Sequence, residues 1–167
     1  STVMWNDELW TELSIHLLKK DYNVIFKPHP RADSKKEIAL FNHIKKRTKL
    51  INKKIKIIKR SILAENLTKD ADIVITCNSV GANVALGNGL PVIYIDTPFN
   101  KNQVLHKLKS NNDIILTSNW IQAINKVDSL FNNKKDLIKW KKKGYLSYMK
   151  LNGNPKIFCK KFFNLVF

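Results

Sequence analysis

The chain has 167 residues, of which 44% are hydrophobic and 10% aromatic, and its 30 Lys+Arg against 13 Asp+Glu give a formal net charge of +17. This length and composition exclude a disordered chain and are typical of one globular domain with a substantial core. The sequence has neither an apolar run long enough for a transmembrane helix nor an N-terminal signal-peptide pattern, so neither is expected.

Apolar periodicity divides the chain into alternating helices and strands. Spacings of three to four residues predict amphipathic helices, and short β-branched runs predict buried strands. In chain order we expect a helix over Met4–Lys20, a strand over Tyr22–Lys27, a helix over Ser34–Leu50, a strand over Ile55–Ile58, a helix over Ile62–Lys69, a strand over Ile73–Ile75, a short helix over Val80–Leu86, strands over Val92–Ile95 and Asp113–Thr117, and helices over Asn119–Phe131, Lys134–Lys150 and Ile157–Val166. This order predicts an α/β fold, a Rossmann-like parallel sheet with helices on both faces.

Two of these helices carry more detailed expectations. The inner edge of the second helix is predicted at Ile38, Phe41, Ile44 and Lys45. The helix that begins near Asn119 is predicted to be capped by Ser118, because a hydroxyl at this position can accept a hydrogen bond from the first helical turn.

The cysteines and histidines form no recognisable motif. Cys77 and Cys159 stand far apart, so we expect no disulfide framework and a reducing, cytoplasmic setting. The four histidines show no spacing typical of zinc ligands, so no metal is expected.

The basic excess gathers in two segments. Residues 42–60 hold nine Lys or Arg and no acid, and residues 134–161 hold ten Lys and one acid, Asp136. Such segments favour anionic partners such as nucleic acid, an acidic membrane face or a polyanionic substrate. A compositional bias on solvated faces explains them equally well, and the sequence leaves both interpretations open.

Two polar loops follow predicted strands and carry the chemistry. They are Lys27-Pro28-His29-Pro30-Arg31 and Asn78-Ser79-Val80-Gly81. In a parallel sheet both loops lie at the carboxyl edge, where ligands bind. The prolines fix the backbone around His29, whose imidazole can bind a phosphate together with the guanidinium of Arg31. Ser79 offers a hydroxyl at the start of the short helix, and Gly81 permits close backbone approach.

Ordinary structural roles compete with this interpretation. His29 alone could cap a helix, and Asn78 or Ser79 could be a simple N-cap without excluding ligand contact.

These motifs resemble the C-terminal half of GT-B glycosyltransferases. The residues concerned are KPHPR after a strand, then a strand, an Asn-Ser turn, Gly81 with Ala85-Leu86, and Gly89-Leu90-Pro91-Val92-Ile93. The resemblance covers residues 23–96 well and the remainder by topology. It is strongest to bacterial surface-polysaccharide transferases with cytidine-activated donors, such as Kdo transferases, sialyltransferases, polysialyltransferases and CDP-glycerol transferases.

The resemblance implies roles for individual residues. His29 would be catalytic, contacting the donor phosphate together with Ser79, and Pro30 would shape the loop. The donor-binding residues expected on this basis are Lys27, Pro30, Arg31, Asn78, Ser79, Val80, Gly81 and Asn83. Asn83 stands where many relatives carry a Glu that holds the donor ribose, and this departure leaves donor identity and full activity open.

The resemblance also implies an organisation and a set of partners. Residues 1–150 would form the nucleotide-donor-binding domain, half of a GT-B fold, and residues 151–167 a basic, aromatic C-terminal helix. The chain would be a metal-independent glycosyltransferase without a cofactor, transferring a sugar or polyol phosphate from a CMP- or CDP-linked donor to a surface polysaccharide or lipid-linked acceptor. An N-terminal acceptor domain would supply the general base, and an anionic membrane surface at the inner face of the cell membrane is a further expected partner.

Three other functions remain open from the sequence. A UDP-sugar 2-epimerase would share the half-fold, although it usually carries an acid in the second motif, where this chain has Asn78-Ser79. A basic nucleic-acid-binding module would fit the charge but lacks a stacking or helix-turn-helix motif, so nucleic acid is not expected as a partner. A catalytically silent scaffold half would fit Asn83.

Overall fold

The fold was analysed in a computed structural model of the chain. It describes residues 7–27, 34–47, 54–58, 62, 64–77, 81–96 and 113–152. The expected terminal helix over Ile157–Val166 lies outside these residues.

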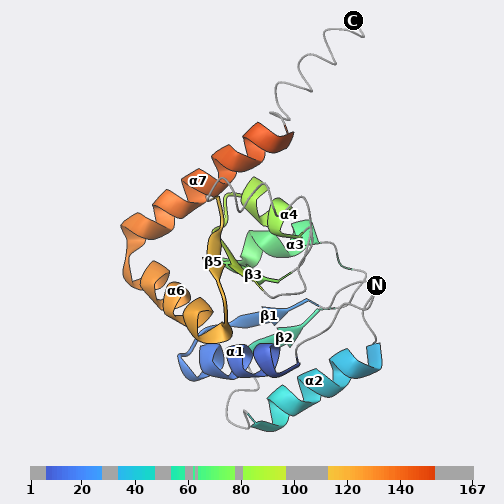
Figure 1. Ribbon diagram of the computed structural model, residues 1–167. Coiled ribbons are helices and arrows are strands. Elements are labelled where there is room, and N and C mark those ends of the chain that lie inside the picture. Colours follow the sequence, from blue (N-terminus) through green and yellow to red (C-terminus); the bar gives the residue numbers. More distant parts are fainter. Residues whose placement is uncertain are drawn as a thin grey trace, which may run out of the picture.

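The described elements follow the predicted order and confirm the α/β fold class (Figure 1). They are α1 (Asp7–Lys19), β1 (Val24–Phe26), α2 (Ser34–Arg47), β2 (Ile55–Ile57), α3 (Ala64–Leu67), the 3-10 turn η1 (Thr68–Asp70), β3 (Val74–Thr76), α4 (Gly81–Gly87), β4 (Val92–Ile95), β5 (Ile115–Thr117), α6 (Trp120–Asn132) and α7 (Lys134–Asn152).

The strands are all parallel but fall into two sheets. One sheet has the order β1-β2 and the other the order β3-β4-β5. The sheets share a core, because Val24 of β1, Ile73 before β3 and Ile75 of β3 pack onto the buried cluster that contains Ile93 of β4. Side-chain packing thus continues across the boundary between the sheets.

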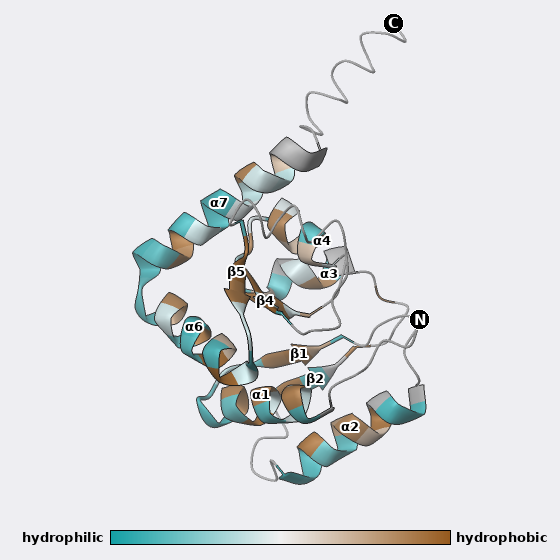
Figure 2. Cartoon of the chain, in the orientation of Figure 1, coloured by the Kyte–Doolittle hydropathy of each residue, from teal (hydrophilic) through white to brown (hydrophobic). Residues whose placement is uncertain are grey.

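The two faces of β4 define two layers of core. Ile93 and Ile95 face a cluster shared with α1 and α6, whereas Val92 and Tyr94 face a cluster shared with α4. All four residues are at most 1% exposed, so the strand is closed to water on both faces. This burial explains why it reads as a continuous apolar run rather than an alternating one. Figure 2 shows the same separation, with hydrophobic strands inside and hydrophilic colour on the outer faces of the helices.

A third cluster joins α2 to the smaller sheet. Leu40 and Ile44, one helical turn apart, are 4% and 1% exposed and pack with Phe26 and Ile55. The predicted inner edge was therefore right at Ile44 and wrong at Ile38, which is 56% exposed.

Lys45 was also wrongly placed on that inner edge. It is exposed, and its ammonium group lies 5.0 Å from the ring centroid of half-buried Phe41.

The cap of α6 also differs from the prediction. Asn119, not Ser118, is the N-cap, and its side chain accepts a hydrogen bond from the backbone N–H of Gln122. Ser118 instead donates from its backbone N–H and its hydroxyl to the Gln122 side-chain oxygen. Adjacent Ser and Asn are both good caps, so composition alone cannot choose between them.

The long helix α7 closes the fold by crossing from one layer to the other. Near its start Leu137 and Trp140 pack against the α1–α6 side, and further along Tyr148 packs against the α4 side. Two glycines, Gly144 of α7 and Gly87 of α4, permit these two helices to approach each other closely. A Cβ on Gly144 would lie 2.6 Å from Leu86 Cδ2, and one on Gly87 would lie 2.9 Å from the Tyr148 ring. In the part of the chain that the structure describes, no helix is long and apolar enough to cross a membrane.

We predict that Gly144→Ala destabilises the domain. Alanine is favoured over glycine inside a helix by about 1 kcal/mol. Here the added methyl group meets Cδ2 of Leu86, a fully buried side chain that would have to shift within the core. Overpacking of this kind costs about 1–3 kcal/mol, so a net loss of about 1 kcal/mol is expected in urea unfolding.

The exposed substitution Lys142→Ala in the same helix is the control, and should leave the unfolding free energy nearly unchanged. A Gly144→Ala protein more stable than the native chain would show that α4 and α7 do not pack as closely as described.

Candidate functional site

The two loops singled out by the sequence leave the carboxyl ends of β1 and β3. Lys27 directly follows β1, Cys77 directly follows β3, and Gly81 begins α4. The predicted site residues within the two loops themselves lie outside the described residues. They are His29, Pro30 and Arg31 in the first loop and Asn78, Ser79 and Val80 in the second.

Each of these strands begins a crossover to a parallel partner. From β1 the chain passes through α2 to β2, and from β3 it passes through α4 to β4. Figure 1 shows β1 between β2 and the larger sheet, with α2 and α4 on opposite sides of the molecule. In open α/β proteins ligands bind beyond the carboxyl ends of the parallel strands. Each of the two loops begins at such a strand end, within its own sheet.

Cys77 directly follows β3 and is the last described residue before the second loop. This cysteine is half-buried against the main core cluster, and burial raises the pKa of its thiol to about 11. The thiolate is the nucleophilic and metal-binding form, so Cys77 is chemically inert at neutral pH. Among the described residues no three His, Cys, Asp or Glu side chains gather as metal ligands.

The first turns of α4 combine tightly packed residues with Asn83, whose amide side chain is half-buried. Ala82, Ala85 and Leu86 are fully buried against the sheet, and Gly81 and Asn83 are half-buried beside them. This anchoring fixes where the second loop re-enters the fold. The helix has only seven residues, so its dipole is a minor source of positive potential, and any anion here depends on side chains.

Sequence analysis overlooked Asp96, which directly follows β4. It is exposed, and its backbone N–H donates to the Thr117 carbonyl oxygen at 2.7 Å, which holds it at the carboxyl edge. The pKa of Tyr94 is raised, first by burial and then by electrostatic interaction with Asp96 and Cys77. The signal was available: Asp96 is the first polar residue after a buried parallel strand.

Charged residues flank the strands at both ends. Asp21, Asp72 and Asp113 stand shortly before β1, β3 and β5, but Lys20 and Lys54 also precede β1 and β2, and the Lys54 ammonium group pairs with the Asp21 carboxylate. At the carboxyl ends, Lys27 follows β1 and Asp96 follows β4. The described charges therefore do not divide by sign between the two ends of the strands.

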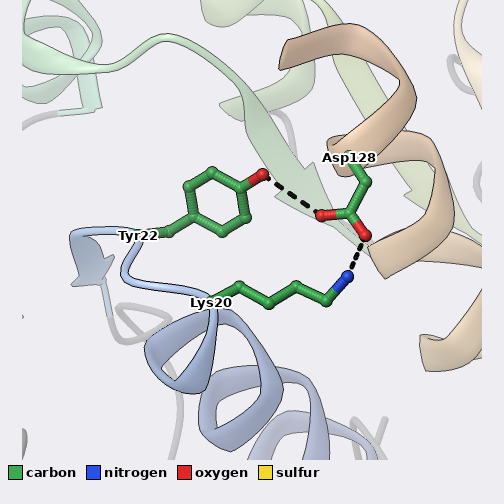
Figure 3. Close-up of polar contacts among 3 residues, drawn as sticks. All are labelled: Lys20, Tyr22 and Asp128. Atoms are coloured by element: carbon green, nitrogen blue, oxygen red, sulfur yellow. Dashed lines mark hydrogen bonds and ion pairs between the residues drawn. The ribbon is translucent and has the colours of Figure 1, made fainter. Parts of the chain in front are cut away.

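The entry into β1 is held by α6 (Figure 3). The Tyr22 hydroxyl donates to Asp128 Oδ1 at 3.1 Å, and the Lys20 ammonium group pairs with the other oxygen of that carboxylate. The Tyr22 ring also stacks on Phe131, with ring centroids 4.9 Å apart. These contacts join the turn after α1 to α6 and thereby fix the strand that leads to Lys27.

Comparison with known proteins links the first part of the chain to one family. Residues 6–80 match the family model of alpha-2,8-polysialyltransferase, a stretch slightly shorter than half of the chain that includes His29 and Ser79 and ends just before Gly81. No curated protein matches the chain. Over these residues the chain is therefore similar to glycosyltransferases that make polysialic acid, and a transferase is the class of enzyme that the match supports.

We predict that the Tyr22–Asp128 contact stabilises the fold and that this contribution disappears in alkali. The pKa of Tyr22 is raised, first by burial and then by its hydrogen bond to Asp128 and the charge of that carboxylate. A raised phenol pKa means that the folded state favours the neutral hydroxyl, so its contribution is complete below a pH of about 10 and falls as the pH rises above it. Tyr22→Phe should cost about 1 kcal/mol at neutral pH in urea unfolding, with the difference from the native chain shrinking at higher pH.

Tyr145→Phe, at an exposed position of α7, is the matched control and should change stability at neither pH. A Tyr22→Phe deficit that stays constant through the alkaline range would contradict the assigned hydrogen bond.

Proposed function

We propose that this chain is the donor-binding part of a glycosyltransferase that uses a cytidine-activated sugar, with a sialic-acid-type donor as the leading candidate. Two independent features support the proposal. The family match covers the loop that contains His29 and the loop that contains Ser79. The observation that carries most weight is that each loop leaves the carboxyl end of a parallel strand, β1 or β3, the end beyond which ligands of α/β proteins bind.

In the proposed reaction the bond between the anomeric carbon of the sugar and the phosphate oxygen of the donor breaks. A new bond forms between that carbon and an acceptor oxygen on a surface polysaccharide or a lipid-linked glycan. The nucleotide leaves with the bonding electrons, and its phosphate gains negative charge. The proton of the acceptor hydroxyl goes to a general base, which we assign to a separate N-terminal acceptor domain, as in the GT-B enzymes that the sequence resembles.

We assign stabilisation of the leaving phosphate to side chains of the two loops. His29 would donate an imidazole N–H to a phosphate oxygen, Arg31 would add two parallel hydrogen bonds, and Ser79 would donate its hydroxyl. A well-placed donor of this kind is worth about 2.7–4 kcal/mol to the transition state, or about 100–1000-fold in rate. Because α4 is so short, these side chains would carry most of that work. They supply enough positive charge for the step to be proposed without a metal.

Asn83 is assigned to the ribose of the donor. It lies in the first turn of α4, half-buried beside residues that pack against the sheet. Its amide oxygen can accept one hydrogen bond from a ribose hydroxyl, although it lacks the charge of the Glu found in many similar enzymes. Weaker ribose binding would leave recognition of the donor more dependent on the phosphate and the sugar.

We predict a large loss of turnover from His29→Ala in the full-length enzyme. The expected decrease in kcat is about 100–1000-fold, with the unfolding midpoint nearly unchanged, because a loop residue at a strand end is removed rather than a core residue. His43→Ala is the matched control, since His43 is an exposed histidine on α2 and should have no effect on turnover. Normal turnover by the His29→Ala enzyme would refute the assignment.

We further predict that the 167-residue chain binds cytidine nucleotides in preference to uridine nucleotides. In a thermal-shift titration, a nucleotide at about 100 times its Kd should stabilise the fold by about 2.7 kcal/mol, and CMP or CDP should reach this effect at lower concentration than UMP or UDP. The Ser79→Ala chain should show a smaller shift with every nucleotide. A preference for UDP would favour the 2-epimerase alternative instead.

A further inference from the structure

The outer side of α7 combines cations and large apolar side chains. Lys135, Ile138, Lys139, Lys142, Tyr145 and Leu146 are all exposed, and their spacing of three, four and seven residues places them on one side of the helix. We call these six residues the α7 outer face. Ile138 is 64% exposed, the highest value among the large hydrophobic residues exposed in the described part of the chain, and Leu146 and Tyr145 are 49% and 43% exposed.

The opposite side of the same helix accounts for its packing. Leu137, Trp140 and Tyr148 pack against the two core layers, and Gly144 approaches Leu86. The apolar residues of the α7 outer face are therefore not needed to hold the helix on the domain. Figure 2 shows hydrophobic and hydrophilic residues alternating along α7 where it runs along the rim of the molecule.

The charge on this face has one sign. The acid of α7, Asp136, is half-buried and accepts a hydrogen bond from the Asn133 side chain, so it is directed toward the start of the helix rather than toward the lysines. The sequence after α7 has the same character, with Lys156, Lys160 and Lys161 among four phenylalanines and no acid. The basic and aromatic composition that would favour an anionic partner thus continues in the sequence beyond the helix.

The apolar members of the face distinguish among anionic partners. A nucleic acid or an acidic glycan presents charge and polar groups, and offers an exposed isoleucine or leucine nothing to bury against. A bilayer with anionic lipids offers both a charged surface and a hydrocarbon boundary. At a membrane interface, large apolar side chains enter the headgroup boundary, and lysines beside them can extend their flexible stems so that the ammonium groups reach lipid phosphates.

We propose that the α7 outer face docks the protein onto the surface of an anionic lipid bilayer. The lysines would contact lipid phosphates and carboxylates, while Ile138, Leu146 and Tyr145 would enter the boundary between headgroups and acyl chains. The helix would lie parallel to the surface, with the two core layers above it. This inference rests on α7 and does not depend on the proposed transferase activity.

The test measures binding of the whole chain to vesicles of phosphatidylcholine with and without phosphatidylserine. Binding is expected to need phosphatidylserine and to weaken with salt. Lys135→Gln/Lys139→Gln/Lys142→Gln should weaken it about 100-fold, since each lysine near an anionic surface contributes roughly fivefold. Ile138→Ser/Leu146→Ser should weaken it about tenfold while retaining the charge. Both variants change exposed side chains, and their unfolding midpoints serve to verify the fold.

The helix α2 provides a matched control. It also exposes lysines and an isoleucine, so Lys35→Gln/Lys36→Gln/Lys46→Gln and Ile38→Ser remove the same groups from a different part of the surface. These variants should keep vesicle binding within about twofold of the native chain. Equal losses from α2 and α7 variants would overturn the proposal in favour of unspecific charge attraction. Competition by a soluble acidic polysaccharide, together with unchanged binding by Ile138→Ser/Leu146→Ser, would identify a glycan-binding surface instead.

Discussion

The fold depends on the burial of β4 on both faces. Val92, Ile93, Tyr94 and Ile95 are at most 1% exposed, so water is excluded from alternate side chains on opposite sides of one strand. A strand with two apolar faces requires a layer of helices on each face of the sheet. A parallel neighbouring strand requires a crossover connection that brings the chain back to the end at which the first strand began. Once these conditions are met, the loops that leave β3, β4 and β5 all start at the same edge of their sheet.

The helix α7 makes the two layers dependent on each other. Its first half packs with Leu137 and Trp140 on the side of α1 and α6, and its second half packs with Tyr148 and Gly144 on the side of α4. On the side of α1 and α6, Tyr22 also ties the entry of β1 to α6 through Asp128 and Phe131. Contacts made by the surrounding helices therefore stabilise the strands that lead into the candidate site.

Sequence patterns predicted most of the elements because burial imposes its period directly on the residues. They failed where two neighbours have nearly equal preference. Ser118 and Asn119 can both cap a helix, and Ile38 and Leu40 are both apolar, so only the approach angle of α2 to β2 decides that Leu40 is buried. Asp96 was missed because it belongs to no recognised motif, although it directly follows the predicted strand over Val92–Ile95. The candidate loops were found from chemistry, and their strand ends are now placed, while the roles of His29 and Ser79 stay predictions.

The net charge of +17 illustrates why composition alone is a poor guide to partners. Lys27 directly follows β1, at a strand end beyond which ligands of α/β proteins bind. Cations on α7 stand among exposed isoleucine, leucine and tyrosine side chains on the convex surface of a helix. Such a surface cannot enclose a small anion, but it can make contact with a broad anionic surface. The same residue type therefore serves different chemistry in the two places, and the apolar side chains around each lysine, rather than the lysines themselves, distinguish the two.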